Sequence, residues 1–483
     1  MQTPVLRFAR TLTWPDNDGH LTALTGRFGC RFREDGHERN HGNAGLGSFQ
    51  MTAEVLANNL WVLICGLLVF TMTIAVGLLE VGELGHNLVR SLLKTILITG
   101  IAVFVMAVVG FNTAFAPTLG GIIGNPVYGP RLFLGGFSSD TAGIWWSVTG
   151  SGLRIGTYFL FETAFAAVTL ALVAVVVLHK VKLSVFAIYS VVYFAVIWAL
   201  PAAWIWNPSG WLAKLGMVDF AGGLVVHAAA GAAGLGIVLQ IWIEERAHGR
   251  KTSPAVPYHL NVGWLTIAIL LLWVGWFGFN PGSVLAFNDE AIVVVVTTFV
   301  AAATAMVSTS LVSWILTRER LSPLYPVNGI LMGLIVITPL AGFVSVGSAM
   351  ILGVLCGPLF VYAERVVGRM TWLADPVGLF PGHLVGGVFG VLMIAFFAQT
   401  QFATGSGAAT LPNGLLFGGG GAAFKQLGIE AFGIVVVAAV VLALSYLTMR
   451  ILAAIMKGIT TDYLDSDADA SMTSGTTEST VVG

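Results

Sequence analysis

The sequence predicts an all-α polytopic membrane protein with eleven transmembrane helices. Of its 483 residues, 56% are hydrophobic and only 10% are charged, and the mean hydropathy is +0.87. The apolar residues form runs of about 20 residues, the length that an α-helix needs to cross a bilayer. Such long runs favour helices over a β-barrel.

The predicted spans follow one another from residue 59 to residue 455. They are residues 59–80, 91–116, 153–178, 183–206, 219–242, 259–280, 290–316, 327–345, 347–364, 376–399 and 426–455. The eighth and ninth spans are short and closely joined.

A pattern of one Asp, one His and two Gly occurs twice, at the fifth and tenth spans. Its members are Asp219, His227, Gly231 and Gly234 in the first copy, and Asp375, His383, Gly387 and Gly390 in the second. Each Asp precedes its His by eight residues, about 12 Å along a helix. If the Asp lies near one membrane face, the His therefore lies near the midplane. An ionisable group there is costly, so both His are candidate functional residues.

The repeat divides the chain into two halves of opposite orientation. Residues 58–242 and 259–400 each contain five spans, and a long final helix covers residues 426–455. Because five is odd, the second half enters the membrane upside down relative to the first, as in many transporters. We therefore expect the two His to meet at the midplane, and the glycines Gly231 and Gly387 to let the helices approach closely.

The two ends of the chain differ from this membrane domain of residues 58–458. Residues 1–57 form a polar extension without a long apolar run, and translation starting at Met51 is an equally good interpretation of it. Residues 459–483 are rich in Asp, Ser and Thr, which predicts a disordered tail.

The Lys and Arg residues between the spans predict the orientation of the chain. Thirteen belong to the loops on one side and four to those on the other. The first set is Arg90, Lys94, Lys180, Lys182, Arg246, Arg250, Lys251, Arg318, Arg320, Arg365, Arg369, Arg450 and Lys457; the second is Arg131, Arg154, Lys214 and Lys425. The positive-inside rule places the first set in the cytoplasm, with the N-terminus outside and the C-terminus inside.

Motifs for other functions are missing from the sequence. The three cysteines, Cys30, Cys65 and Cys356, form no disulfide framework and have no metal-ligand spacing. No Gly-rich loop ends in Lys-Ser or Lys-Thr to cradle phosphates, which argues against an ATP-driven pump. We expect no cofactor, no bound metal, no nucleic-acid partner and no enzymatic activity.

Three motifs resemble those of the ammonium transporter family, Amt/Mep/Rh. They are DFAGGLVVH from Asp219, GWFGFNPGS from Gly275 to Ser283, and the second Asp–His pattern from Asp375 to Gly387. The resemblance covers about residues 58–458. It implies a plasma-membrane homotrimer in which each protomer has its own narrow, mostly apolar pore.

The resemblance also implies roles for individual residues. His227 and His383 are similar to the paired pore histidines. Phe165, Trp206 and Ser283 are similar to an outer site that recruits ammonium, with Trp204 as a weaker alternative to Trp206. Phe165 and Phe279 are similar to a phenylalanine gate. The supporting residues that the resemblance indicates are Asp219, Phe161, Trp276 and Asp375.

The resemblance predicts an ammonium transporter, with methylammonium as a surrogate substrate. In one mechanism ammonium is deprotonated outside, ammonia crosses the pore, and the histidines relay the proton; in the other, only neutral ammonia passes. A membrane ammonium sensor with little flux and an Rh-like gas channel are alternative functions. Trp206 and Ser283 favour the Amt/Mep branch over the Rh branch.

Two features of the sequence are less clear. The tail lacks the family's usual Gly-Leu-Asp…His-Gly-Glu pattern, which disfavours regulation by a PII-type signalling protein without removing it. Glu162 replaces a frequent Gln, and attraction of substrate and helix packing are equally good interpretations of it. Glu80 and Glu83, near the end of the first span, are expected to be structural.

Overall fold

A computed structural model describes residues 52–84, 88–128, 152–177, 180–249, 260–318, 322–373, 375–403 and 411–460. Most of the predicted N-terminal extension, including Met51, and most of the predicted acidic tail lie outside these residues.

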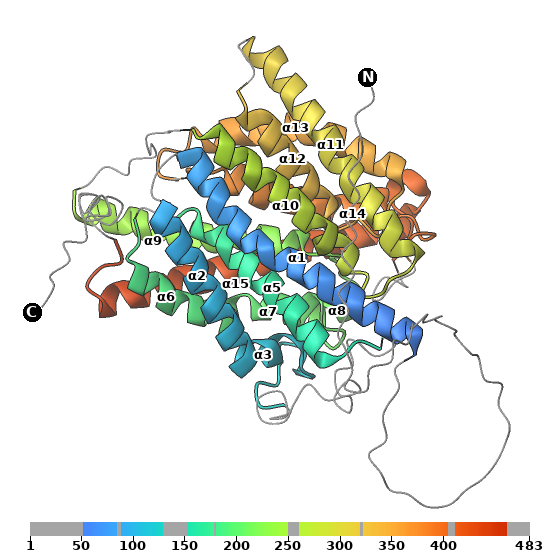
Figure 1. The fold of residues 1–483 in the computed structure, drawn as a ribbon, viewed down its shortest axis with the longest axis horizontal. Helices are drawn as coiled ribbons and strands as arrows, with labels where there is room; N and C mark the ends of the chain where they lie inside the picture. Colours follow the sequence, from blue (N-terminus) through green and yellow to red (C-terminus); the bar gives the residue numbers. More distant parts are fainter. Residues whose placement is uncertain are drawn as a thin grey trace, which may run out of the picture. The chain divides into compact units, whose positions relative to one another are not determined.

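Helices fill most of the described chain (Figure 1). The first half contains α1 (Ala53–Leu84), α2 (Leu88–Val105), η1 (Met106–Gly110), α3 (Phe111–Phe115), α5 (Ile155–Ala174), α6 (Leu183–Val192), η4 (Tyr193–Ile197), α7 (Ala199–Ile205), α8 (Trp211–Leu215), η5 (Gly223–Ala228) and α9 (Ala229–Ala247). The second half contains α10 (Val262–Gly282), α11 (Asp289–Thr317), α12 (Leu324–Ile337), α13 (Val346–Val367), η6 (Leu379–Leu384) and α14 (Val385–Phe397), followed by η7 (Leu415–Phe417) and α15 (Gly420–Ile455). Strands β1 (Thr118–Leu119) and β2 (Ile123–Gly124) form a short antiparallel pair.

The predicted all-α polytopic fold is confirmed. Ten helical stretches in the described residues are long and apolar enough to cross a membrane, and each coincides with a predicted span. The eighth predicted span corresponds to α12, which has only 14 residues. It ends at Ile337 rather than at residue 345, because Pro339 has no N–H to continue the helix.

The fifth and tenth spans begin a few residues later than predicted. η5 starts at Gly223 and η6 at Leu379, and both are π-helical turns that continue into ordinary α-helix. The residue before each turn is a glycine in the left-handed region, Gly222 with φ 111° and Gly378 with φ 78°. Other residues adopt this region only with strain, so the same backbone bend sets both helix starts.

The first helices of the two halves pack side by side. α1 lies along α10 and also contacts α5, while α11 packs against α12 and α13 (Figure 1). The long α15 packs along α9. The two π-helical turns contact each other, so the two copies of the Asp–His pattern meet between these helices.

Two glycines allow the two copies to approach, as the sequence predicted. A Cβ on Gly387 would lie 2.4 Å from the Gly223 carbonyl oxygen and 2.9 Å from the Ala228 nitrogen. A Cβ on Gly231 would lie 2.5 Å from Cβ of Leu384 in the other copy. Even a methyl group at either position would therefore push the two turns apart.

Lys94, counted above as a loop residue, lies buried within a helix. Lys94 belongs to α2, where its Nζ is 2.9 Å from Oε1 of Glu80 and also donates to the Ala174 carbonyl. Ser91 donates to the other oxygen of Glu80. The buried Lys94 thus joins α2 to α1 and α5. Because it lies inside the protein and is paired, it gives no information about the orientation of the chain in the membrane. Glu80 is structural, as the sequence predicted.

The close approach at Gly387 gives a first prediction. Gly387→Ala is expected to destabilise the protein by about 1–3 kcal/mol, the usual result of overpacking. Thermal unfolding of the detergent-solubilised protein measures the change. Gly428→Ala in α15 is the matched control, because a Cβ there meets nothing within 4 Å. Equal melting temperatures for the two variants would contradict the assigned close approach.

Candidate functional site

The two histidines of the repeated pattern contact each other. Nδ1 of His383 lies 3.2 Å from Nδ1 of His227, so one ring nitrogen donates to the other. Both side chains are buried, with exposed fractions of 1% for His227 and 8% for His383. Nε2 of His227 has no hydrogen-bond partner among the described residues. The pair therefore has a free nitrogen that can exchange a proton.

Aromatic rings hold His227 in place. Its ring stacks on Trp276 with a centroid distance of 5.6 Å and on Phe279 with a distance of 5.7 Å. Nε1 of Trp276 donates to Oγ1 of Thr338 at 3.0 Å, which fixes the indole. These contacts leave His227 little freedom to rotate away from His383.

A cavity of about 230 Å³, the first vestibule, lies at one end of this arrangement. Its lining includes the aromatic rings of Phe161, Phe165 and Trp206, the hydroxyl of Ser283, and the carboxylates of Glu162, Asp219 and Glu290. Trp206 belongs to the lining, whereas Trp204 does not and donates instead to the Ile122 carbonyl. Ser283 donates its hydroxyl hydrogen to the Phe279 carbonyl at 2.9 Å, so its oxygen can still accept a hydrogen bond.

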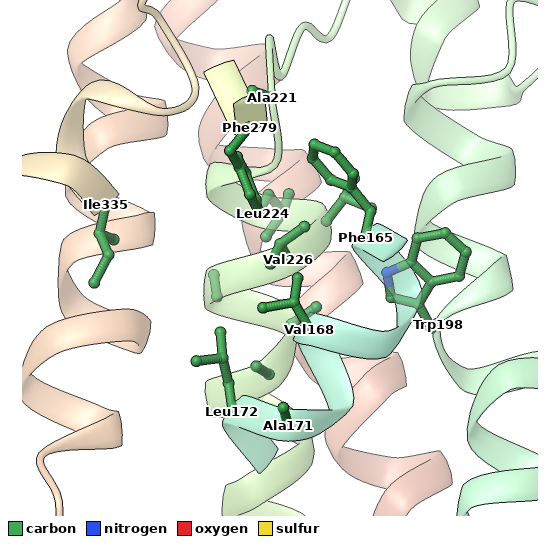
Figure 2. Close-up of a cluster of buried hydrophobic side chains, with 14 of the residues drawn as sticks. Phe165, Val168, Ala171, Leu172, Trp198, Ala221, Leu224, Val226, Phe279 and Ile335 are labelled. Atoms are coloured by element: carbon green, nitrogen blue, oxygen red, sulfur yellow. The ribbon is translucent and has the colours of Figure 1, made fainter. Parts of the chain in front are cut away.

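Two phenylalanines close the floor of the first vestibule. The rings of Phe165 and Phe279 are in contact, with centroids 4.2 Å apart and planes tilted by 36°, and Phe165 also meets Trp206 edge-on at 5.8 Å. Figure 2 shows Phe165 facing Phe279, with Val168 and Leu172 of α5 following it along the helix. The rings lie between the first vestibule and the histidines.

A row of cavities continues beyond the phenylalanines. Two cavities of about 20 Å³ each share His383 in their linings, and the nearer one also contacts His227, Trp276 and Phe279. The farther one shares Asn328 and Gly378 with a larger cavity of about 240 Å³, the second vestibule. Apolar side chains such as Val76, Leu172 and Leu331 line most of the narrow part. The arrangement is a narrow apolar path between two wider ends.

The two Asp residues of the pattern cap the helix starts. Oδ1 of Asp219 accepts the N–H groups of Gly222 and Gly223, and Oδ2 accepts those of Leu224 and Val225, at 2.7–3.0 Å. Asp375 accepts the N–H groups of Leu379 and Phe380 at 2.8 and 2.9 Å. A membrane supplies no water to these groups, so the carboxylates replace it.

The two caps lie at opposite ends of the path. Asp219 lines the first vestibule and Asp375 the second. The two helix starts therefore enter from opposite sides, the arrangement expected of an inverted repeat.

Several residues of this site were not predicted from the sequence. Thr338 supports Trp276, and Glu290 lines the first vestibule. Glu83 and Glu364 line the second vestibule together with Asp375. Glu83 was expected to be purely structural. No motif marks these residues, and only the packing of distant helices brings them to the path.

Comparison with known proteins identifies relatives of the chain. The family model described as Ammonium Transporter Family matches residues 60–473. The ammonium transporter Amt1 of Archaeoglobus fulgidus is 32% identical over 365 residues, which are 75% of this chain and 84% of that protein. An ammonium transporter of Bacillus subtilis is 29% identical over 382 residues, which are 77% of this chain and 87% of that protein.

Solved structures also match. The crystal structure of Saccharomyces cerevisiae Mep2 has a TM-score of 0.70 and 26% identity, and the match covers 83% of this chain and 86% of that one. A structure described as a sensor Amt protein has a TM-score of 0.72 and 26% identity, covering 86% and 97% of the two chains.

The role of Asp219 as a cap leads to a second prediction. Asp219→Ala leaves four backbone N–H groups without an acceptor, and each bond to a charged group contributes about 1.5–3 kcal/mol. We expect loss of folded protein, measured as the monodisperse fraction after detergent extraction. Asp289→Ala, at an exposed position in the first turn of α11, is the control and should extract normally. Normal extraction of Asp219→Ala would show that the cap is dispensable.

Proposed function

The chain belongs to the ammonium transporter family, and we propose that it recruits ammonium at the first vestibule, separates it into ammonia and a proton, and conducts the ammonia along the apolar path. Membership of the family makes it an ammonium transporter and not an enzyme. The observation that carries the mechanism is the buried contact between His227 and His383, between two vestibules.

The first vestibule provides two kinds of attraction for ammonium. The ring faces of Phe165 and Trp206 attract a cation, and a desolvated contact of this kind contributes about 2 kcal/mol. The oxygen of Ser283 accepts an N–H bond, which ammonium can donate and potassium cannot. This pair of contacts supports the selection of ammonium over an ion of similar size and charge.

Glu162 supports the same role. It is 5% exposed, lines the first vestibule, and its Oε2 has no partner among the described residues. Of the two interpretations of this residue, attraction of the cation is therefore the one we propose.

Deprotonation solves the problem of crossing the apolar path. A bare ion in a membrane interior is strongly disfavoured, whereas neutral ammonia is not. Ammonia passes when the rings of Phe165 and Phe279 move apart, since their contact closes the path. The proton follows through the adjacent imidazoles, in which one nitrogen accepts while the other donates.

The setting of the protein completes the proposal. We propose a homotrimer in the plasma membrane, as the family resemblance implies. One chain supplies every residue of the path described above, which supports one pore per protomer. The distribution of Lys and Arg supports an outward first vestibule, an extracellular N-terminus and a cytoplasmic C-terminus. A PII-type regulator remains disfavoured because the usual tail pattern is missing.

A sensor with little flux is the second candidate function. It is favoured by the likeness to the structure described as a sensor Amt protein, of which this chain covers 97%. The site described here fits either function, since a sensor also needs to bind ammonium selectively. A measurement of ammonium flux distinguishes a transporter from a sensor.

The third prediction tests the histidine pair. In proteoliposomes, ammonium is expected to evoke a current in the native chain, and His227→Ala should abolish it or change its ion selectivity. His248→Ala, at an exposed site just after α9, is the control with a normal current.

The outcomes of this experiment separate the mechanisms. Ammonia flux without current, detected by an internal pH dye, would mean a channel for neutral ammonia. Neither signal, with ammonium binding intact, would favour the sensor.

The fourth prediction tests recruitment. Trp206→Leu removes a cation–π contact of about 2 kcal/mol, so the ammonium concentration for half-maximal transport should rise about 30-fold. Potassium should compete more effectively in this variant. Trp372→Leu, on an exposed turn after α13, is the matched control. An unchanged half-maximal concentration in Trp206→Leu would exclude the indole from recruitment.

A further inference from the structure

The final helix, α15, belongs to neither repeat, but it holds the segment that leads into Asp219. Gln426 of α15 donates from Nε2 to the Gly216 carbonyl at 2.9 Å and to Oε1 of Glu430 at 2.6 Å. The same Oε1 accepts the N–H of Val218 at 3.2 Å. Both side chains are buried, with exposed fractions of 6% for Gln426 and 0% for Glu430. Two residues of α15 therefore hold both ends of the short segment 216–218.

This segment is bent and packs tightly on α15. Gly216 ends α8 in the left-handed region, with φ 99°. Met217 lies directly against Gly433 of α15, because a Cβ on Gly433 would collide with the Met217 sulfur. Met217, Val218 and Asp219 all line the first vestibule. Helix α15 thus supports one wall of that vestibule from behind.

The backbone of Asp219 connects this support to the aromatic wall of the vestibule. Its carbonyl oxygen accepts the indole N–H of Trp206 at 2.8 Å. An indole has one N–H donor, so this bond alone fixes the polar edge of the ring. Because Val218 and Asp219 are adjacent, a shift of Val218 moves the carbonyl that holds Trp206.

We propose that Glu430 is a positioning residue for the ammonium-recruiting site, and that it acts on Trp206 through the backbone of Val218 and Asp219. The inference rests on the proposed function, since it assigns Glu430 to the recruitment step. The described lining of the first vestibule does not include Glu430, so this side chain does not touch the cation. Its effect is to hold the indole face in the vestibule wall.

Glu430 acts as a hydrogen-bond acceptor and not as a charge. Oε1 accepts both bonds, whereas Oε2 has no donor among the described residues. The charged group that acts on Glu430 is another carboxylate, Asp219, and like charges repel each other. An amide oxygen can accept the same two bonds. Glu430→Gln should therefore keep the wall in place. Glu430→Leu should release it, because a buried N–H at Val218 without an acceptor is unfavourable.

Transport by these two variants tests the proposal. The full chain in proteoliposomes is given labelled methylammonium. The half-saturating concentration should rise about tenfold in Glu430→Leu, less than for complete loss of the indole, with the maximal rate little changed. Glu430→Gln should match the native chain. Lys425→Gln, exposed on the same helix, is the control. A native value in Glu430→Leu, or an equal rise in Glu430→Gln, would overturn the proposal.

A double variant tests whether Glu430 acts through Trp206. In a Trp206→Leu background, Glu430→Leu should raise the half-saturating concentration no further, because no indole is left to be positioned. The same fold-rise in both backgrounds would overturn the proposal, since the effect would then be independent of the ring.

Hydrogen–deuterium exchange tests the positioning without transport. In the intact chain in detergent, the N–H groups of residues 216–225 should exchange faster in Glu430→Leu than in Glu430→Gln, while those of α13 exchange equally. If the native chain shows no flux, this difference would support the positioning role although the transport mechanism is rejected. Flux in the native chain with identical exchange in the two variants would reject the positioning role alone. Gln426→Leu, which removes the bond to Gly216, replaces Glu430→Leu if that variant does not fold.

Discussion

The rest of the structure depends on the close contact between the two helix starts inside the protein, η5 and η6. A helix that begins in an apolar environment leaves its first N–H groups without partners. Asp219 and Asp375 supply those partners, and Gly222 and Gly378 supply the bend that precedes each turn. Only then can the two turns lie against each other and bring His227 to His383.

The glycines that follow each histidine, Gly231 and Gly387, also allow η5 and η6 to approach each other. Gly387 lies against the backbone around His227, and Gly231 lies against Leu384, next to His383. In each half of the protein, a glycine without a side chain therefore leaves room for the π-helical turn of the other half. The histidine contact is a property of both halves together, which explains why the pattern is needed twice.

The spans and the histidine pair could be predicted because their signals are local. Apolar length defines the helices, and the eight-residue spacing between Asp and His, repeated in both halves, predicted that the two rings would meet, although the helices begin four residues after each Asp, at Gly223 and Leu379. The π-helical turns could not be predicted, since they depend on how Asp219 folds back over Gly222 to Val225. The pairing of Lys94 with Glu80 and the gathering of Glu83 and Glu364 depend on packing between helices far apart in the sequence.

Phe279 contacts two different functional elements of the path. One neighbour is Phe165, its partner in the proposed gate, and the other is His227, whose ring stacks on Phe279 with a centroid distance of 5.7 Å. The proposed gate and the proposed proton relay thus share one side chain. In the proposed mechanism, a displacement of this ring that admits ammonia also removes a support of the imidazole. The mechanism therefore couples the timing of the two events through Phe279, without a separate signal between them.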